Sequence, residues 1–184
     1  SVLEALYSTP AGKNTIVIVL ADHGDGMGSH RMVTKQVSFY EEMTNVPFII
    51  AGPGIHPRQK PVEDLLTQPT IDLLPTLCEL AGIPVPSSKP GISLAPFLKG
   101  EKQKRQHPYA ASEWHSEYEV TVSPGRMIRS PRYKYTHYLE GNGEELYDML
   151  KDKGERRNLA HDPKYSKILA EHRALLDDYI RRTQ

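Results

Sequence analysis

The sequence predicts an α/β protein that ends in a small antiparallel sheet packed on a terminal helix. Two short apolar runs rich in β-branched residues, 15–21 and 46–51, precede glycine-containing turns and are typical of buried strands. Apolar residues recur at helical spacing over 71–81 and 163–182, which indicates two amphipathic helices. Short strand candidates cluster between these helices, and together they favour the antiparallel sheet.

The N-terminal elements follow from local patterns. A short helix is expected near 2–8, and the strand 15–21 comes after a Pro-Ala-Gly turn. Beyond the glycine-rich loop, 36–44 is a candidate helix that precedes the second strand. The proline-marked stretch 55–66 is expected to be a loop.

The predicted helix 71–81 contains a proline that needs a physical reason. Pro75 is tolerated if Asp72 caps the helix, because proline then falls in the first turn, where backbone donors lack partners anyway. Gly82 is placed as the C-cap. Cys78 lies on the apolar face of this helix, so we expect a buried structural thiol.

The C-terminal region is expected to form a separate subdomain. Its strand candidates are 109–114, 126–129, 133–138 and 145–148. His172 falls in the apolar stripe of the last helix and is expected to be a core or boundary histidine. A stretch rich in Pro, Ser, Lys and Gly precedes these elements and indicates a connection. The predicted domain ranges are therefore 1–83 for part of an α/β domain, 84–108 for the connecting segment and 109–184 for a small α+β subdomain.

Composition excludes several classes of function. The 23 basic and 23 acidic residues balance and are mixed along the chain, which argues against nucleic-acid or membrane-surface binding through a basic field. No apolar stretch is long enough to span a membrane. The single cysteine rules out an internal disulfide.

Asp22 and His23 directly follow the first predicted strand, and a flexible run containing Gly24 comes next. In open α/β sheets, ligands gather where strands end. A carboxylate oxygen and an imidazole nitrogen suit a divalent metal ion, although the pair does not choose which ion. The alternative is that Asp22 caps a turn and His23 is a partly exposed loop residue.

Several further segments accompany this Asp-His-Gly in a fixed order. They are a Gly-x-His stretch with a lysine five residues after the histidine, 28–35; a Tyr-Glu pair, 40–41; a Val-Pro pair, 46–47; and the stretches 72–77, 81–83, 145–148 and 155–160. In this order they resemble the sulfatase family of the alkaline phosphatase-like superfamily. The resemblance implies that 1–83 belongs to the catalytic α/β domain and holds part of an alkaline phosphatase-like sheet.

The resemblance also exposes a gap. Sulfatases attack sulfur with a formylglycine made from Cys or Ser in a Cys/Ser-x-Pro-x-Arg motif near the N-terminus. Cys78 lacks the required Pro and Arg, and the run from Ser8 has Pro10 but ends in Gly12 where arginine is needed. Two upstream aspartates of the family's metal site are not recognisable either. We therefore expect this chain to be the C-terminal portion of a sulfatase, inactive alone, whose formylglycine and remaining metal ligands come from the N-terminal part.

By the resemblance, Asp22 and His23 are two ligands of the active-site metal. The expected ion is Ca²⁺, with Mg²⁺ and Mn²⁺ as alternatives because His stands where Asn is common. Lys35 aligns with the family lysine that contacts the sulfate and helps stabilise the leaving oxygen, so we assign it catalytic and substrate-binding roles. Without the flanking motif, Lys35 would be an ordinary solvated lysine.

Two more histidines are site candidates. His30 could hold a substrate oxygen or take part in proton transfer, and it could equally orient the glycine-rich loop. His115 is a candidate substrate contact, because the C-terminal subdomain of sulfatases borders the substrate cleft. The alternative is that Trp114 anchors the small sheet and His115 is simply exposed.

The resemblance implies hydrolysis of a sulfate ester, on a carbohydrate or another alcohol or phenol, by a metal-assisted formylglycine mechanism. The expected partners are a sulfated small molecule or glycan and the N-terminal part of the same chain, with no nucleic acid and no membrane span. Two alternatives stay open: a phosphatase or phosphonate monoester hydrolase of the same superfamily, and a non-catalytic carbohydrate-binding module. The parent is expected to work outside the cytoplasm, in the periplasm, as a secreted protein or in lysosomes.

Overall fold

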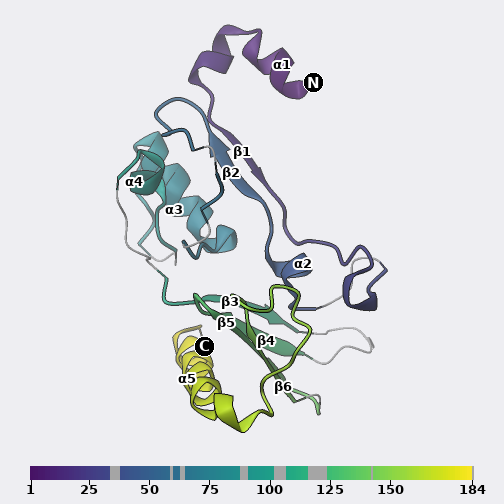
Figure 1. The fold of residues 1–184 in the computed structure, drawn as a ribbon. Coiled ribbons are helices and arrows are strands. Elements are labelled where there is room, and N and C mark those ends of the chain that lie inside the picture. Colours follow the sequence, from purple (N-terminus) through teal and green to yellow (C-terminus); the bar gives the residue numbers. More distant parts are fainter. Residues whose placement is uncertain are drawn as a thin grey trace. The chain divides into compact units, whose positions relative to one another are not determined.

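The computed structural model describes residues 1–33, 38–58, 60–62, 65–87, 91–101, 107–115, 124–141 and 143–183 (Figure 1). The chain forms two compact units, Ser1–Asp22 with Val46–Gln106 and His23–Asn45 with His107–Gln184. These units differ from the ranges predicted from the sequence, because 23–45 groups with the C-terminal part and 84–106 with the first unit. The boundaries at 83 and 108 stay a prediction.

The first unit holds the predicted N-terminal helix and both apolar strands. Its elements are α1 Val2–Tyr7, the 3-10 helix η1 Pro10–Asn14, β1 Val17–Leu20, β2 Phe48–Ala51, α3 Pro69–Ala81 and α4 Ala95–Leu98. The short helix α4 was not predicted, since it lies in the stretch interpreted as a connection. β1 and β2 pair antiparallel, with Val17 opposite Ala51. Their expected burial is wrong for this chain: Val19 is 49% and Ile49 58% exposed.

The start of α3 differs from the prediction. The helix begins at Pro69, with Gln68 in the N-cap position, so Asp72 does not cap it. Asp72 is instead buried, and its carboxylate accepts the backbone N–H groups of Gln68 at 2.8 Å and Ile92 at 2.9 Å. One buried carboxylate thus joins the helix start to a loop twenty residues later.

Pro75 consequently lies inside α3 and not in its first turn. It has no N–H to donate to the carbonyl of Ile71, which a helix would otherwise use. Gly91 has φ of +109° and passes so close that a Cβ there would lie 2.0 Å from this carbonyl oxygen. The predicted C-cap is confirmed, because Gly82 is left-handed, and Cys78 is buried as expected.

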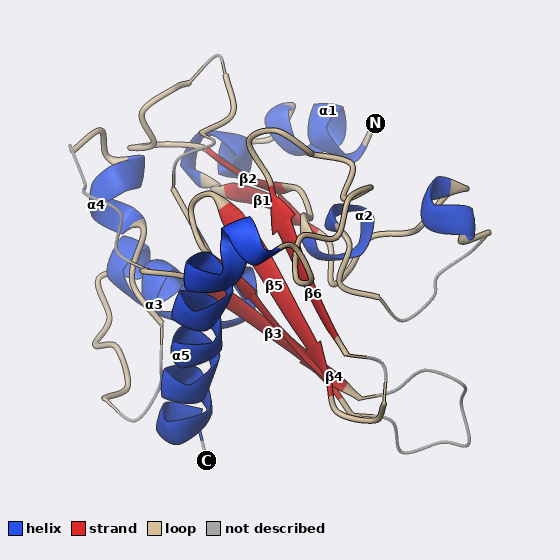
Figure 2. Ribbon diagram, turned by 60° about the horizontal axis from the view of Figure 1, so that its bottom comes forward, coloured by secondary structure: helices blue, strands red, loops and turns tan. Residues whose placement is uncertain are grey.

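The second unit contains the predicted antiparallel sheet and terminal helix. Its elements are η2 Ser29–Arg31, α2 Glu41–Thr44, β3 Ala110–Trp114, β4 Gly125–Arg129, β5 Tyr133–Tyr138, β6 Glu144–Asp148, η3 Pro163–Tyr165 and α5 Ser166–Thr183. The strands form one sheet in the order β3-β4-β5-β6, and α5 lies along it (Figure 2). Of the candidate helix 36–44, the described residues show only α2 as helical.

Both faces of this sheet are covered. Ile128, Tyr135 and Leu146 stand opposite one another across β4, β5 and β6 and pack in the core cluster with α5. Because side chains alternate along a strand, Lys134 and Tyr147 point to the other face. There they meet the segment 38–45, which leads into and contains α2.

His172 of α5 has the predicted structural role. It is buried, its Nδ1 lies 2.8 Å from the Ile168 carbonyl oxygen, and its Nε2 lies 2.8 Å from Ser130 Oγ. Each nitrogen of a neutral ring therefore has a partner, and burial lowers the pKa of His172. Among the helices that the structure describes, none is both long and apolar enough for a membrane span.

Candidate functional site

A buried lysine attaches the segment 38–45 to the sheet. Lys134 of β5 is 1% exposed. Its ammonium has three close oxygens, the Phe39 carbonyl at 2.9 Å, Glu41 Oε1 at 2.7 Å and Glu155 Oε1 at 2.9 Å, and Thr44 Oγ1 lies farther away at 3.5 Å. The other Glu155 oxygen accepts the backbone N–H of Glu41 at 2.6 Å. A buried charge is stable only when it is paired and hydrogen-bonded. The Lys134 ammonium meets both requirements, because it is paired with two carboxylates and donates a hydrogen bond to the Phe39 carbonyl.

Glu155 is an unusual residue in this arrangement. Burial raises the pKa of its carboxyl, and the neighbouring Lys134 charge opposes that rise. Its backbone is left-handed, with φ of 49°, a conformation that costs energy for a residue with a side chain. The contacts of its carboxylate with Lys134 and with the Glu41 N–H hold Glu155 in this conformation, between the sheet and segment 38–45.

His30 stacks on Tyr40, the first residue before α2. The ring centroids are 3.7 Å apart and the ring planes differ by 2°. Tyr40 in turn packs against Tyr147 of β6, with ring centroids 6.4 Å apart. Burial raises the pKa of the Tyr40 phenol. A line of three rings therefore connects His30 to the sheet.

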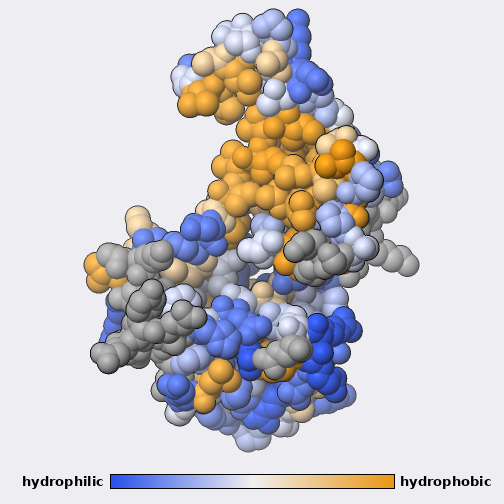
Figure 3. Space-filling model, turned by 180° about the vertical axis from the view of Figure 1, so that it is seen from behind, coloured by the Kyte–Doolittle hydropathy of each residue, from blue (hydrophilic) through white to orange (hydrophobic). Residues whose placement is uncertain are grey.

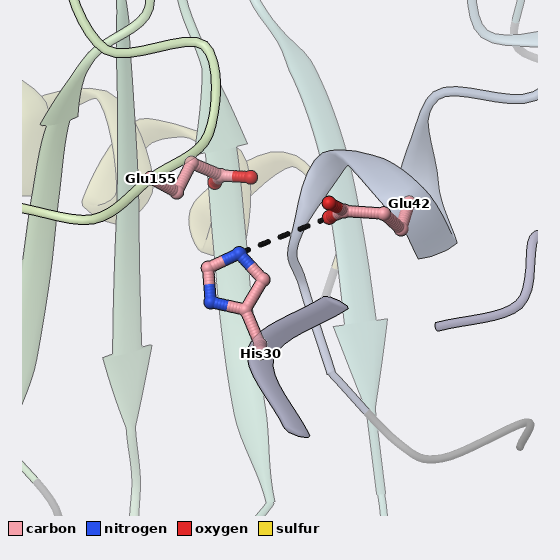
Figure 4. Close-up of side chains that lie close together, drawn as sticks. All are labelled: His30, Glu42 and Glu155. Atoms are coloured by element: carbon pink, nitrogen blue, oxygen red, sulfur yellow. Dashed lines mark ion pairs between the residues drawn. The ribbon is translucent and has the colours of Figure 1, made fainter. Parts of the chain in front are cut away.

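Two carboxylates face the imidazole of His30. Its Nε2 lies 3.9 Å from Glu42 Oε2, and Glu155 completes a group whose ligand-type atoms all lie within 4.8 Å of one another (Figure 4). The three side chains come from η2, from α2 and from the loop after β6. They can form an ion pair when the imidazole is protonated, which suits a group that binds or passes a proton.

These donors do not fit a metal site well. A histidine and two carboxylates are suitable ligand types. Both oxygens of Glu155, however, are already used, by the Lys134 ammonium and by the Glu41 N–H. A metal ion at Glu155 would have to displace a buried ammonium, or share the carboxylate with it against charge repulsion. We therefore interpret the His30 group as an acid–base cluster.

The boundary between the two compact units falls between Asp22, which belongs to the first, and His23, which belongs to the second. Asp22 is exposed. Nδ1 of His23 lies 2.8 Å from the Gly24 carbonyl oxygen. If Nδ1 carries the proton and donates it there, Nε2 keeps the lone pair that metal coordination needs. The donor chemistry of His23 thus fits a metal ligand.

Gly24 explains why glycine follows this pair. Its N–H donates to the Met43 carbonyl at 2.9 Å, and a Cβ at Gly24 would lie 1.7 Å from the Glu42 carbonyl oxygen. No larger residue fits without moving the α2 backbone. The loop after His23 is therefore joined directly to the helix that supplies Glu42.

The other predicted site residues stand as follows. Lys35 lies outside the described residues. His115 is exposed at the end of β3, with Nε2 3.2 Å from Glu113 Oε2, and the same carboxylate oxygen accepts a hydrogen bond from Arg126 Nε at 3.1 Å. The structure brings His23, His30 and His115 into the second unit, and Asp22 into the first.

Sequence reasoning missed the partners of His30. Tyr40 and Glu155 both lie in segments that carried the family resemblance, but neither had been given a role. Lys134 had a weaker signal: it is a lysine between tyrosines within a strand. Its burial could be inferred only by knowing that a second segment covers that face of the sheet.

Comparisons with known proteins agree with this architecture. Residues 28–182 match the family model described as N-sulphoglucosamine sulphohydrolase, C-terminal. A Delta 4,5-hexuronate-2-O-sulfatase from Bacteroides thetaiotaomicron is 78% identical over 184 residues, which are 100% of this chain and 38% of that protein. The solved structure of a 2-O GAG sulfatase matches with a TM-score of 0.94 and 78% identity, over 98% of this chain and 39% of that chain.

A phosphonate monoester hydrolase from Silicibacter pomeroyi has a similar fold, with a TM-score of 0.85 and 27% identity over 100% of this chain and 38% of that chain. The chain thus spans about two fifths of the length of each of these proteins. The family match covers most of the chain, including the His30 cluster and the sheet that supports it. The chain belongs to the N-sulphoglucosamine sulphohydrolase C-terminal family, and with it to the sulfatases.

Proposed function

We propose that the parent protein hydrolyses a sulfate ester at the 2-O position of an unsaturated hexuronate in a sulfated glycan. The observation that carries this proposal is the 78% identity, over the whole of this chain, to a relative with that named activity. The substrate of this chain's parent is inferred from that likeness.

Sulfate-ester hydrolysis needs positive charge around the sulfate oxygens and a proton for the departing alkoxide. Asp22 and His23 would hold a divalent cation, with Ca²⁺ expected and Mg²⁺ or Mn²⁺ as alternatives, which would supply part of that charge. Lys35 would contact the sulfate and the leaving oxygen. The nucleophile, a formylglycine, would come from the N-terminal part of the parent.

His30 is our candidate for the group that gives a proton to the leaving oxygen. Its Nε2 faces Glu42, and its ring plane is held by Tyr40. In this arrangement the imidazole can exchange a proton with the leaving oxygen while the carboxylates balance its charge. His115 would contact the sugar further from the reacting sulfate. A location of the parent outside the cytoplasm stays a prediction from the resemblance.

The rest of the parent would also cover an apolar surface of the first unit. Large apolar side chains stay exposed there, and Figure 3 shows a broad orange area over this unit. They include Val2, Leu3, Val19, Leu20, Ile49, Leu74 and Leu77. Contiguous apolar surface of this kind is typical of an interface. We propose that it packs against the N-terminal part, so this chain alone is inactive.

The test compares the parent and this chain on a 2-O-sulfated unsaturated disaccharide and on a phosphonate monoester. We expect the parent to release sulfate with the higher kcat/KM and this chain to release none. His30→Ala and Lys35→Ala should each lower kcat of the parent by about 10² or more, the size expected for a general acid or a charge-stabilising group. The exposed Lys164→Ala is the matched control.

Three results would contradict the proposal. A higher kcat/KM for the phosphonate would support the phosphonate hydrolase alternative, which the TM-score of 0.85 keeps open. Binding of the disaccharide by the parent without turnover would support a carbohydrate-binding module. Sulfate release by this chain alone would show that it already contains a complete active site.

A further inference from the structure

We propose that Tyr40 is a positioning residue for His30, held in place by the buried Lys134. The catalytic meaning of this inference rests on the proposed function, because that is where His30 receives its role. The stack between the two rings is a separate claim about the structure and can be tested without any turnover.

The backbone at His30 adopts a strained conformation. It lies in a three-residue 3-10 turn, η2, and both His30 and Arg31 have left-handed backbones, with φ of 50° and 63°. Two consecutive residues with side chains in this region are strained and persist only when the surroundings require it. A catalytic imidazole here needs a support from another part of the fold.

Tyr40 provides that support as a flat surface. The two rings are parallel within 2° at 3.7 Å, so rotation of the imidazole about its side-chain bond would collide with the phenol ring. The stack restricts the plane of the imidazole, and Glu42 at 3.9 Å from Nε2 defines which edge faces the carboxylates. Plane and edge together determine where Nε2 points.

Tyr40 is itself held from both sides along the chain. Lys134 Nζ binds the carbonyl oxygen of Phe39, the residue before Tyr40, at 2.9 Å. The same ammonium binds the carboxylate of Glu41, the residue after it, at 2.7 Å. The Tyr40 carbonyl oxygen also accepts the N–H of Met43 at 2.9 Å. One buried cation from the sheet therefore fixes the backbone that carries the stacking ring.

A purely structural role for the stack explains fewer of these contacts. A purely structural stack would serve only to keep segment 38–45 on the sheet, but the Lys134 contacts already do this without His30. The ring of Tyr40 reaches past those contacts, between Tyr147 on the sheet side and His30 on the other. The residue that gains a defined orientation from Tyr40 is His30.

The experiment uses the full parent protein with three variants. Tyr40→Phe keeps the stacking ring and removes the hydroxyl, whereas Tyr40→Leu removes the ring and keeps apolar volume. The matched control is Tyr133→Leu in the same unit, because Tyr133 contacts another histidine, His172, with ring centroids 5.7 Å apart at 76°. Two readouts are compared: kcat and KM on the 2-O-sulfated disaccharide, and the imidazole proton resonances of selectively labelled histidines.

We expect Tyr40→Leu to lower kcat by about 10- to 100-fold, the scale of a misplaced catalytic group, with KM changed by less than about threefold. It should also move the His30 ring-proton resonances downfield, because the shielding phenol face is lost. Tyr40→Phe should restore both values to nearly those of the wild type. Tyr133→Leu should move the His172 resonances and leave kcat and KM unchanged. Unchanged His172 resonances would show that Tyr40→Leu is folded. If it is not folded, Tyr40→Met takes its place.

Two outcomes would overturn the inference. If the His30 resonances do not respond to Tyr40→Leu, the stack is absent in solution. If they respond but kcat stays within about twofold of wild type, less than any expected cost of misplacing the group, Tyr40 does not position a catalytic His30. A wild-type parent without sulfatase activity would instead refute the proposed function, and the resonances would still decide the stack.

Discussion

The two compact units treat their apolar residues differently. In the second unit, Ile128 and Leu146 are completely buried between the sheet and α5. In the first unit, Val19 and Ile49 lie in paired strands and are about half exposed. Both pairs have the apolar, branched composition of core strands. The difference shows that such composition identifies side chains that favour burial, but does not tell which other element buries them.

The cause is the number of elements that each unit supplies. Among its described residues, the second unit has four strands with α5 on one face and the segment 38–45 on the other. The sheet that β1 and β2 form has two strands. A two-stranded sheet is at best marginally stable alone, because it cannot bury a full face. We therefore expect most of the stability of this chain to come from the second unit.

Removal of the buried Lys134 ammonium should destabilise the second unit strongly. Lys134→Met leaves the carboxylates of Glu41 and Glu155 without their common partner. We expect the free energy of unfolding to fall by about 3–5 kcal/mol, as for other broken buried ion pairs. Urea unfolding followed by the fluorescence of Trp114 measures this, because Trp114 is the single tryptophan in the sequence and lies in the second unit.

Two controls accompany that measurement. Lys164→Met removes an exposed lysine of the same unit and should change stability by less than about 0.5 kcal/mol. The double variant Lys134→Met with Glu155→Gln should lose less free energy of unfolding than the two single variants lose together, because the neutral amide no longer needs the ammonium. A loss below about 1 kcal/mol for Lys134→Met would show that the network is not buried in solution.

A second test compares the two units directly. Leu146→Ala should cost about 2–5 kcal/mol, because it opens a cavity in a packed core. Ile49→Ala should cost less than about 0.5 kcal/mol in this chain, since its side chain is already largely in water. Chemical denaturation of each variant measures both values. Equal costs would mean that β2 is covered in solution and that the contrast between the units is wrong.

The stability of the second unit should also depend weakly on pH through His172. Burial lowers the pKa of His172, so as pH falls below about 6.5 the unfolded chain takes up that proton before the native state does. This residue's contribution to stability is complete above that pH and is lost on acidification, by at most about 1.4 kcal/mol per pH unit. His172→Gln and His172→Leu should remove the same slope, although their stabilities differ. An unchanged slope between pH 7.5 and 5.5 would contradict the prediction.

Local patterns were enough for most of the elements. The strands of the second unit, the terminal helix, the Gly82 cap and the buried Cys78 follow from periodicity and composition. The predicted start of α3 was wrong, because Asp72 followed by Pro75 also suits a helix that Asp72 caps, whereas α3 begins at Pro69. The structure instead employs Asp72 to hold Ile92, a contact between distant residues that no local rule contains.

For the site, the sequence was enough to identify the family. It also predicted that the Asp22-His23 pair, Lys35, His30 and His115 carry the chemistry, and these roles stay predictions. The surroundings of His30 could be known only from the fold. Tyr40, Lys134 and Glu155 are far apart along the chain, and they meet because one segment covers one face of one sheet. Burying a charge requires a partner, and the position of that partner is a property of the fold.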